Sequence, residues 1–495
     1  MISVHRISIF SLTAVCISVV VSLYADSLFV NPCNDAKSLL LGNLTEKDSN
    51  PSYVAVIDAG STGTRLHLFE FQQTDSLQFD VKKENFKEVK PGLSSFVADP
   101  DGAGDSVQEL LDTAHKIVPE SCLRQTPMIL RATAGLRLLK SSESEAILKK
   151  VTASKTVSGS NKNFKVKERV NASGFLVSED SVAVLSGTEE GVFSWFTLNV
   201  LLDRMKHIDE AKKECFLTQE SVKPTKSLRK LAAALDLGGG STQVTFLPYD
   251  HETVALGIDR QEFSHKIKVF GKMAQLYTHS YLSNGLIAAR HGITKELQSL
   301  ESGHYLSSCF PTGYMVESLD YSGRKWSVQG YASSFEGCLN STKLYVEKTG
   351  IRVVPELTHH DIYAFSYFYD RGLQAQLVPR ATDSRGGSIT VGDYMRAAKR
   401  ACSRKGSDIG VKYSEAWKCL DLSYIYSLLH YGYGLKNEKE IYVRLAKRLR
   451  DMEVSWALGA SYDLINTLYQ TESKPLIDDL KNDTDELRTC VYLNV

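Results

Sequence analysis

Two short segments of this chain combine an aspartate with a turn rich in glycine and hydroxyl residues. The first is DAGSTGTR at residues 58–65, and the second is DLGGGSTQ at residues 236–243. Each aspartate ends an apolar run, and each turn leads into an alternating apolar stretch, as expected for strand–turn–strand units. Two such units, starting at residues 58 and 236, indicate a duplicated fold whose turns face one cleft.

The residue types in these turns are suited to binding phosphate. Glycine lets backbone N–H groups approach an anion closely, and consecutive N–H groups in a turn form a concave anion site. Hydroxyl donors add to both turns: Ser61, Thr62, Thr64, Ser241 and Thr242. One glycine-rich turn would be weak evidence, whereas two matching turns that each follow an aspartate predict a pair of phosphate-binding loops.

The two aspartates have the chemistry of ligands for a hard divalent cation. Asp58 and Asp236 offer carboxylate oxygens, which Mg²⁺ and Ca²⁺ prefer, and Mg²⁺ retains several waters when bound. We therefore expect these residues to hold Ca²⁺ or Mg²⁺ through water. The alternative is that each aspartate only caps its own turn by bonding to the backbone.

A third segment, SGTEEG at residues 186–191, precedes an apolar helix expected at 192–202. Its threonine and glutamates suit a helix start, where acidic residues are favoured. A carboxylate here would also suit a general base that activates water. The residues alone do not decide between these interpretations, nor between Glu189 and Glu190. The segment RATAGLR at 131–137 follows a short strand and by itself indicates no function.

The pattern along the chain predicts alternating strands and helices, and therefore α/β layers. A chain of 495 residues exceeds one hydrophobic core, so two lobes are expected. The expected helices are 106–117, the buried 192–202, and an amphipathic helix through Ile441, Leu445, Leu449 and Met452. The expected strands are 53–57, 66–71, 128–131, 182–185 and 231–235.

The amino terminus predicts entry into the secretory pathway. His5 and Arg6 precede an uncharged run at 7–24, so residues 1–25 form a signal peptide or an uncleaved anchor. The polar stretch 26–50 is expected to be a linker, and no later segment is long and apolar enough to span a membrane. Basic and acidic residues both number 58, which gives no sign of a nucleic-acid-binding face.

Cysteine usage agrees with an oxidising compartment. One of the nine cysteines lies in the signal, and no pair has the CxxC spacing of zinc or redox sites. Closeness in sequence favours the disulfides Cys309–Cys338 and Cys402–Cys419, while the pairing of Cys33, Cys122, Cys215 and Cys490 stays open. Potential N-glycosylation sites are Asn43, Asn171, Asn340 and Asn482.

Taken in order, these segments resemble the apyrase family of nucleoside di- and triphosphate diphosphohydrolases. The matching segments are DAGSTGTR (58–65), RATAGLRLL (131–139), LSGTEEGVFSWFTLNVLL (185–202), DLGGGSTQVTF (236–246), FGKMAQLYTHSYLSNGLIAAR (270–290), IYAFSYFYDR (362–371) and EVSWALGA (453–460). KPGLSS at 90–95 and the first turn are most like the soluble, lumenal nucleoside-diphosphatase branch. The resemblance extends from about residue 53 to about residue 468.

The resemblance implies a fold similar to actin, sugar kinases and chaperone ATPases, with two ribonuclease-H-like lobes around a nucleotide cleft. It also implies that the last helix returns to the first lobe. The expected lobe I is therefore 51–187 plus 455–492, and lobe II is 188–454.

The resemblance also implies roles for individual residues. Glu190 matches the base that takes a proton from water, Ser241 and Gln243 match residues that orient this water, and Thr133 matches a threonine near water and metal. Asp58 and Asp236 match the aspartates that position the cation. The expected phosphate donors are Ser61, Thr62, Gly63, Gly238, Gly239 and Gly240, and Tyr369 and Tyr424 are expected to sandwich the base.

The expected reaction is hydrolysis of a nucleoside diphosphate, with UDP and GDP preferred over triphosphates, by a monomer in the Golgi or endoplasmic reticulum or after secretion. Two rivals are a sugar-kinase-like phosphotransferase and a nucleotide-gated binding module. The Thr-Glu-Glu-Gly segment and the signal argue against the kinase, because the lumen offers little ATP. The binding module is disfavoured because it has no need to orient water, whereas the chain has Glu190, Ser241 and Gln243 together.

Overall fold

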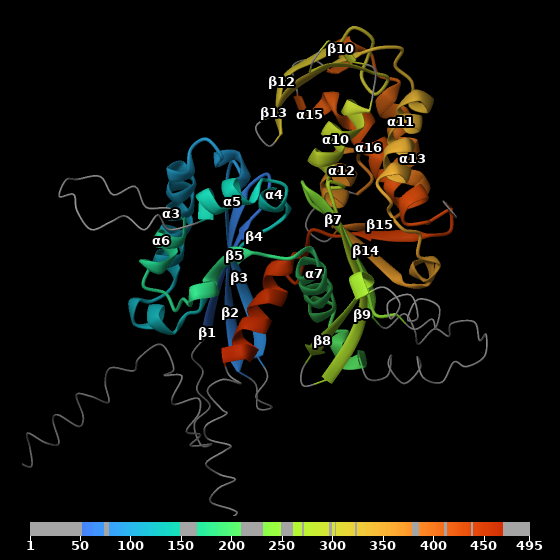
Figure 1. The fold of residues 1–495 in the computed structure, drawn as a ribbon. Coiled ribbons are helices and arrows are strands. Elements are labelled where there is room, and N and C mark those ends of the chain that lie inside the picture. Colours follow the sequence, from blue (N-terminus) through green and yellow to red (C-terminus); the bar gives the residue numbers. More distant parts are fainter. Residues whose placement is uncertain are drawn as a thin grey trace, which may run out of the picture.

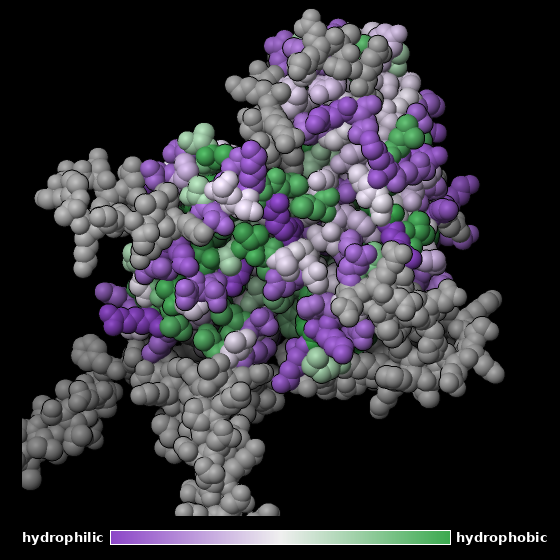
Figure 2. Space-filling model, viewed as in Figure 1, coloured by the Kyte–Doolittle hydropathy of each residue, from purple (hydrophilic) through white to green (hydrophobic). Residues whose placement is uncertain are grey.

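The computed structural model describes residues 52–73, 79–148, 166–208, 231–248, 261–269, 272–296, 299–301, 303–321, 324–378, 386–409, 413–436 and 439–468. The expected signal, the linker, Asn43, Asn482, Cys33, Cys215 and Cys490 lie outside these residues. Among the described residues, no helix is both long and apolar enough to cross a bilayer. On the face drawn in Figure 2, hydrophobic residues lie in small groups between hydrophilic ones.

The first sheet has the strand order β3-β2-β1-β4-β5. β1 and β2 form an antiparallel hairpin that pairs Asp58 with Arg65, while β4 runs parallel to β1 and β5 parallel to β4. The strands are β1 (Ser52–Ala59), β2 (Thr64–Gln73), β3 (Phe79–Val89), β4 (Met128–Ala132) and β5 (Val182–Val184). The first glycine-rich turn therefore joins two adjacent strands at one end of this sheet.

The second sheet repeats this arrangement. Its order is β15-β16-β14-β6-β7-β9-β8, in which β6 and β7 form the hairpin and β14 and β16 are the parallel neighbours. The strands are β6 (Ala232–Leu237), β7 (Ser241–Phe246), β8 (Ser264–Val269), β9 (Lys272–Leu282), β14 (Asp361–Ser366), β15 (Gly387–Thr390) and β16 (Tyr442–Leu445). Strands β9-β7-β6-β14-β16 correspond in order and direction to β3-β2-β1-β4-β5, which confirms the predicted duplication.

Helices cover the outer face of each sheet and fill the space between the two sheets. On the first sheet the outer helices are α3 (Pro100–Ile117), α4 (Ala134–Arg137), α5 (Ser141–Leu148) and α6 (Val166–Asn171). On the second they are α10 (Leu286–Lys295), α11 (Phe335–Lys348), α12 (Tyr367–Gln374), α13 (Val391–Cys402), α15 (Tyr413–Ala416) and α16 (Lys418–Ser427), while the short helix α14 (Gly406–Ile409) follows α13 in the chain. The α/β class is confirmed.

Two helices lie between the sheets, α7 (Gly187–Leu201) and the helix at 456–468 (Figure 1). α7 is buried around most of its circumference, as its apolar sequence predicts, and packs in one cluster with both sheets. The helix at 456–468 contacts the first sheet, because Tyr462 packs edge-on against Phe71 and donates a hydrogen bond to the Phe79 carbonyl (3.1 Å). The division of the chain at residues 187 and 454 stays a prediction.

The second half of the molecule carries an additional sheet with the order β10-β11-β13-β12. Its strands are β10 (Ser299–Glu301), β11 (His304–Ser307), β12 (Met315–Tyr321) and β13 (Arg324–Gly330). Both predicted disulfides are present here: Cys309–Cys338 ties the segment after β11 to α11, and Cys402–Cys419 ties the end of α13 to α16. They stabilise a region in which loops connect many short elements.

The prediction of an amphipathic helix across residues 441–452 is wrong. The chain there forms β16, β17 (Arg448–Leu449) and β18 (Met452–Glu453). In β16 the buried residues Val443 and Leu445 alternate with exposed ones, which is the two-residue period of a strand. The predicted helix was based on Ile441, Leu445, Leu449 and Met452, which are three or four residues apart. It left out Val443, which reveals the two-residue period.

Candidate active site

The two glycine-rich turns line the same cleft, whose volume is about 400 Å³. Gly60, Ser61 and Thr62 come from the first turn, and Gly238, Gly239 and Gly240 from the second. The turns lie in direct contact, since a Cβ atom on Gly239 would be 2.1 Å from the Ser61 hydroxyl oxygen. A side chain at position 239 would force the Ser61 hydroxyl to move, so glycine suits this close approach, and the structure brings these predicted phosphate-binding residues together.

Gly63 differs from the other predicted phosphate-binding residues. It is not among the residues that line the cleft, and a Cβ atom there would lie 2.8 Å from a carboxylate oxygen of Glu88. Its small size therefore serves the packing of the turn against β3.

Asp58 and Asp236 lie in the wall of this cleft at the ends of β1 and β6. They are 8 % and 6 % exposed, and the Oδ1 atom of each has no hydrogen-bond partner in the part of the chain that the structure describes. Burial raises the pKa of Asp58, although the Arg65 guanidinium opposes the rise, and burial together with the Glu190 charge raises the pKa of Asp236 to about 7. Buried carboxylate oxygens without partners are chemically suited to a cation or to its bound waters.

The start of α7 separates the roles of Glu189 and Glu190. Ser186 and Glu189 form a capping box: the Ser186 N–H donates to Glu189 (3.0 Å), and the Glu189 N–H donates to the Ser186 hydroxyl (3.1 Å). Glu189 is thereby held on the exposed side of the helix start, whereas Glu190 is 7 % exposed and lines the cleft. Glu189 therefore caps the helix, and Glu190 is the carboxylate that faces the cleft.

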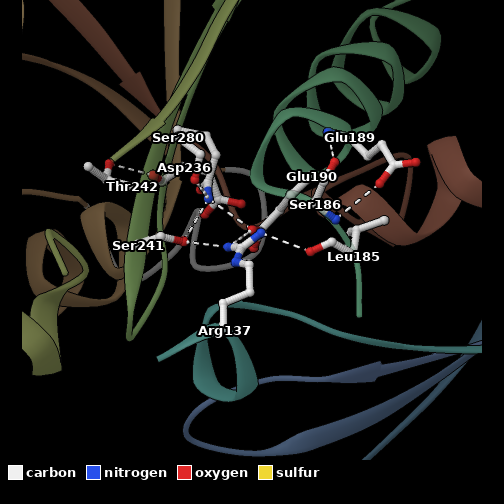
Figure 3. A network of polar contacts seen from close by, with 10 residues as sticks. Arg137, Leu185, Ser186, Glu189, Glu190, Asp236, Ser241, Thr242 and Ser280 are labelled. Atoms are coloured by element: carbon white, nitrogen blue, oxygen red, sulfur yellow. Dashed lines mark hydrogen bonds and ion pairs between the residues drawn. The ribbon is translucent and has the colours of Figure 1, made fainter. Parts of the chain in front are cut away.

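Glu190 is the centre of a polar network at the cleft wall that joins α4, α7 and β7 (Figure 3). Its Oε2 atom accepts hydrogen bonds from Arg137 (2.6 Å) and from the Gln243 amide (2.9 Å). Gln243 also donates to the hydroxyl oxygens of Ser241 (2.7 Å) and Ser280 (3.0 Å), and Arg137 donates to Ser241 (3.1 Å). The structure thus brings together Glu190, Ser241 and Gln243.

Opposing influences act on the Glu190 carboxyl. Burial raises its pKa, whereas the charge and the hydrogen bond of Arg137 lower it, and the net result is a pKa above the ordinary value. A carboxylate with a raised pKa is a better proton acceptor than an exposed one. Arg137 lies in the segment RATAGLRLL, and the sequence alone predicted no role for it.

Thr133 also lies in the wall of the cleft. It lies between β4 and α4 and donates its backbone N–H to the carbonyl of Ala59 in β1 (3.2 Å). This bond fixes the start of α4 beside the first turn, where a Cβ atom on Gly135 would lie 2.8 Å from the Cα of Ser61. Close packing of α4 on the turn also brings Arg137 within hydrogen-bonding distance of Glu190 and Ser241.

The structure does not place Tyr369 and Tyr424 in the cleft, which corrects the expectation that they sandwich a base. Tyr369 is 1 % exposed inside a hydrophobic cluster, and Tyr424 is fully buried and donates to the Asn284 carbonyl (2.6 Å). Tyr367 lines the cleft instead, with the Arg371 guanidinium 5.2 Å from its ring centroid. Residues that are two positions apart in a helix point to nearly opposite faces. Only one of Tyr367 and Tyr369 can therefore face the cleft.

A signal for Tyr367 was present in the sequence. It directly follows IYAFS, which forms β14 together with Asp361, and ligands of open α/β sheets bind beyond the carboxyl ends of the strands. β14 lies parallel to β6, so Tyr367 follows β14 at the same sheet end at which Asp236 closes β6. Arg65 carries a further positive charge into this wall, paired with Asp58 (3.4 Å) and Glu88 (2.9 Å).

Comparison with protein families identifies the chain. The model of the GDA1/CD39 (nucleoside phosphatase) family matches residues 44–477. The chain belongs to this family. Every cleft residue described above falls inside the matched range, so the family match and the geometry concern the same part of the chain.

Among similar curated proteins, nucleoside-diphosphatase uda-1 from Caenorhabditis elegans is 38 % identical over 467 residues, which cover 91 % of this chain and 90 % of the relative. Human nucleoside diphosphate phosphatase ENTPD5 is 34 % identical over 422 residues, covering 84 % and 88 %. Among solved structures, nucleoside triphosphate hydrolase from Neospora caninum aligns with a TM-score of 0.52 at 14 % identity, covering 83 % of this chain and 91 % of that one. The last comparison shows a shared fold.

Proposed function

We propose that this protein hydrolyses nucleoside diphosphates, with UDP and GDP preferred over triphosphates, to a monophosphate and phosphate. The names of two relatives that match most of the chain, nucleoside-diphosphatase and nucleoside diphosphate phosphatase, support this substrate class. The observation that carries the proposal is the placement of Glu190, bonded to Gln243 and facing two phosphate-type turns in one cleft.

In the proposed reaction the diphosphate lies between the two turns, whose backbone N–H groups donate to its oxygens. Glu190 accepts a proton from a water molecule that the Ser241 hydroxyl and the Gln243 amide orient. The water oxygen forms a bond to the terminal phosphorus while the bond to the bridging oxygen breaks, and the monophosphate leaves. Phosphoryl transfer depends mainly on such positioning and charge neutralisation.

Asp58 and Asp236 would hold Ca²⁺ or Mg²⁺ through its bound waters, in agreement with their buried oxygens without partners. The cation would neutralise charge on the phosphate oxygens. It would also remove the mutual repulsion of the cleft carboxylates, which contributes to the raised pKa of Asp236.

Tyr367 is the proposed contact for the nucleobase, in place of the two tyrosines first expected. Its ring lies at the cleft wall, and Arg371, one helical turn later, supports the ring from one side. Stacking on an aromatic face tolerates different bases, since every base has a π-face. This agrees with a preference that includes both a pyrimidine and a purine.

The proposed site of action is the lumen of the Golgi or endoplasmic reticulum, or the outside of the cell, for a monomer that binds no nucleic acid. Two disulfides agree with an oxidising compartment. Asn171 and Asn340, two of the potential glycosylation sites, are exposed. Membrane contact would be limited to an uncleaved N-terminal anchor.

The test is phosphate release from UDP, GDP, CDP, ADP, UTP and ATP, each with Ca²⁺, with Mg²⁺ and with a chelator. We expect release to be fastest from UDP and GDP and to stop in excess chelator. The proposal fails if no diphosphate yields phosphate, or if labelled phosphate is transferred to a sugar and not to water.

A further inference from the structure

A second cluster of potential metal ligands lies beside the cleft and takes no part in the reaction proposed above. It consists of His67 on β2, Glu84 on β3 and Glu453 on β18. A ligand atom of each side chain lies within 4.8 Å of those of the other two. The cluster therefore joins three separate stretches of the chain at one point.

Glu84 fixes the orientation of the histidine ring. The His67 Nδ1 atom and the Glu84 Oε1 atom are 2.7 Å apart, and neither side chain is exposed. The other oxygen of Glu84 accepts the backbone N–H of Glu453 at 2.7 Å. Both oxygens of Glu84 are thus occupied, which holds the imidazole and the β18 backbone in fixed positions.

Two other polar atoms of the cluster have no hydrogen-bond partner among the described residues. These atoms are His67 Nε2 and Glu453 Oε2, and both are buried. Buried polar atoms are nearly always paired, so two unpaired atoms in one cluster call for an explanation. Arg65 is already engaged by Asp58 and Glu88 and forms no hydrogen bond to the cluster within the described chain.

The donor set has the chemistry of a transition-metal site. A metal-bound histidine almost always donates its other ring N–H to a carboxylate or carbonyl, as Glu84 accepts here. Imidazole suits Zn²⁺ and related ions, while all-oxygen sets suit Ca²⁺ and Mg²⁺. Zinc ligands lie about 2.0–2.2 Å from the metal, so the ligand atoms of the cluster, which lie within 4.8 Å of one another, would approach further when the ion binds.

We propose that His67 and Glu453, with Glu84 holding the imidazole, form a binding site for a Zn²⁺-type ion that is separate from the Asp58–Asp236 site. His67 and Glu453 are among the residues that form the cleft wall, so an ion reaches them from the cleft. β18 leads directly into Val454, Ser455 and Trp456, which also line the cleft. The ion would therefore attach this segment to the first sheet.

The test measures Zn²⁺ binding to the full chain by equilibrium dialysis with excess Mg²⁺, which occupies the aspartate site. We expect one tightly bound Zn²⁺ per chain and a Tm that rises with Zn²⁺ concentration. Glu453→Gln and His67→Asn should abolish this binding. Glu84→Gln should weaken it about 10- to 100-fold, the usual effect of removing a residue that orients a ligand.

Matched controls separate this site from other zinc binding. Asp236→Asn, which alters the aspartate site, should retain the Zn²⁺ ion. His265→Asn on β8 and Glu70→Gln on β2 change a histidine and a glutamate elsewhere and should leave the affinity unchanged. Zinc that is lost from Asp236→Asn, or displaced stoichiometrically by added Mg²⁺, would belong to the aspartates and would overturn the proposal.

A second measurement does not depend on the folding of the histidine variant. Co²⁺ in place of Zn²⁺ should give visible absorption bands of a nitrogen–oxygen site in the wild type, and the isosteric Glu453→Gln should lose them. The proposal is wrong if the wild type gives no such bands, or if Glu453→Gln binds Zn²⁺ with wild-type affinity.

Discussion

Replacing Asp236 by asparagine should stabilise the cation-free protein at alkaline pH. The Asp236 carboxyl is 6 % exposed, and its pKa is raised to about 7 by burial first and then by the charge of Glu190. In the unfolded chain the pKa of an aspartate is about 3.9. Folding at pH 8 therefore forces an ionised carboxylate into a site that favours the neutral form.

The sign and size of the effect follow from this pKa difference. A carboxyl whose folded pKa lies above its unfolded value contributes stability that is fully present below about pH 4 and is lost as the pH rises through about 7. A pKa difference of about 3 corresponds to about 4 kcal/mol. Because Glu190 and Asp58 contribute to the repulsion, we treat this figure as an upper bound for Asp236→Asn, whose amide has no charge at any pH.

The assay is urea unfolding of the wild type and Asp236→Asn in chelator at pH 8 and at pH 4.5. The variant should be more stable by about 2–4 kcal/mol at pH 8 and by less than about 1 kcal/mol at pH 4.5. Saturating Ca²⁺ or Mg²⁺ should stabilise the wild type by about 2.7 kcal/mol at 100 times its Kd, and the variant far less.

The matched control is Asp361→Asn. Asp361 is ion-paired with Arg204 (2.7 Å) and Arg444 (2.8 Å), so its replacement should lower the free energy of unfolding. The reasoning about Asp236 is refuted if Asp236→Asn is no more stable than the wild type at pH 8, or if its gain is the same at both pH values.

Three predictions concern turnover and substrate binding in the cleft. Glu190→Gln should lower kcat about 10²- to 10⁴-fold with folding and nucleotide binding retained, measured by phosphate release and calorimetry; near-normal turnover would remove Glu190 from its role. Arg137→Gln removes the group that lowers the pKa of Glu190, so the acidic limb of the kcat/KM profile should move to higher pH; an unshifted limb would contradict this. Tyr367→Ala should weaken UDP binding by about 1 kcal/mol, or ~5-fold, while Tyr369→Phe leaves it unchanged; equal effects would argue against Tyr367 as the base contact.

Local sequence was sufficient to predict the two hairpins and their aspartates. A strand, a glycine-rich turn and a second strand involve contiguous residues, and the order of an apolar run, an acid and glycines repeats at Asp58 and Asp236. The same holds for the disulfides, which link cysteines 29 and 17 residues apart. The hairpins and the disulfides join residues that are close in sequence, so their pairing can be predicted without knowledge of the tertiary fold.

Predictions that depended on side-chain direction were less accurate. Tyr367 and Tyr369 have the same chemistry, and the start of α12 determines which ring faces the cleft. The residues alone left Glu189 and Glu190 open, and only the family resemblance indicated Glu190; the capping box of α7 supplies the physical reason, since it holds Glu189 at the helix start. The segment 441–452 forms strands because β14 and β15 pair with β16 on its two sides, and because β17 and β18 pair with each other.

The sequence by itself determined that this protein has two matching phosphate-type turns with an aspartate before each, because those properties belong to contiguous residues. Only the tertiary structure decided that Arg137 bonds to Glu190 and that His67 meets Glu84 and Glu453. Glu84 and Glu453 are 369 residues apart, and their contact arises from the packing of β18 on the first sheet. Burial also raised the pKa values of the cleft carboxylates, since removal from water depends on every element that covers them.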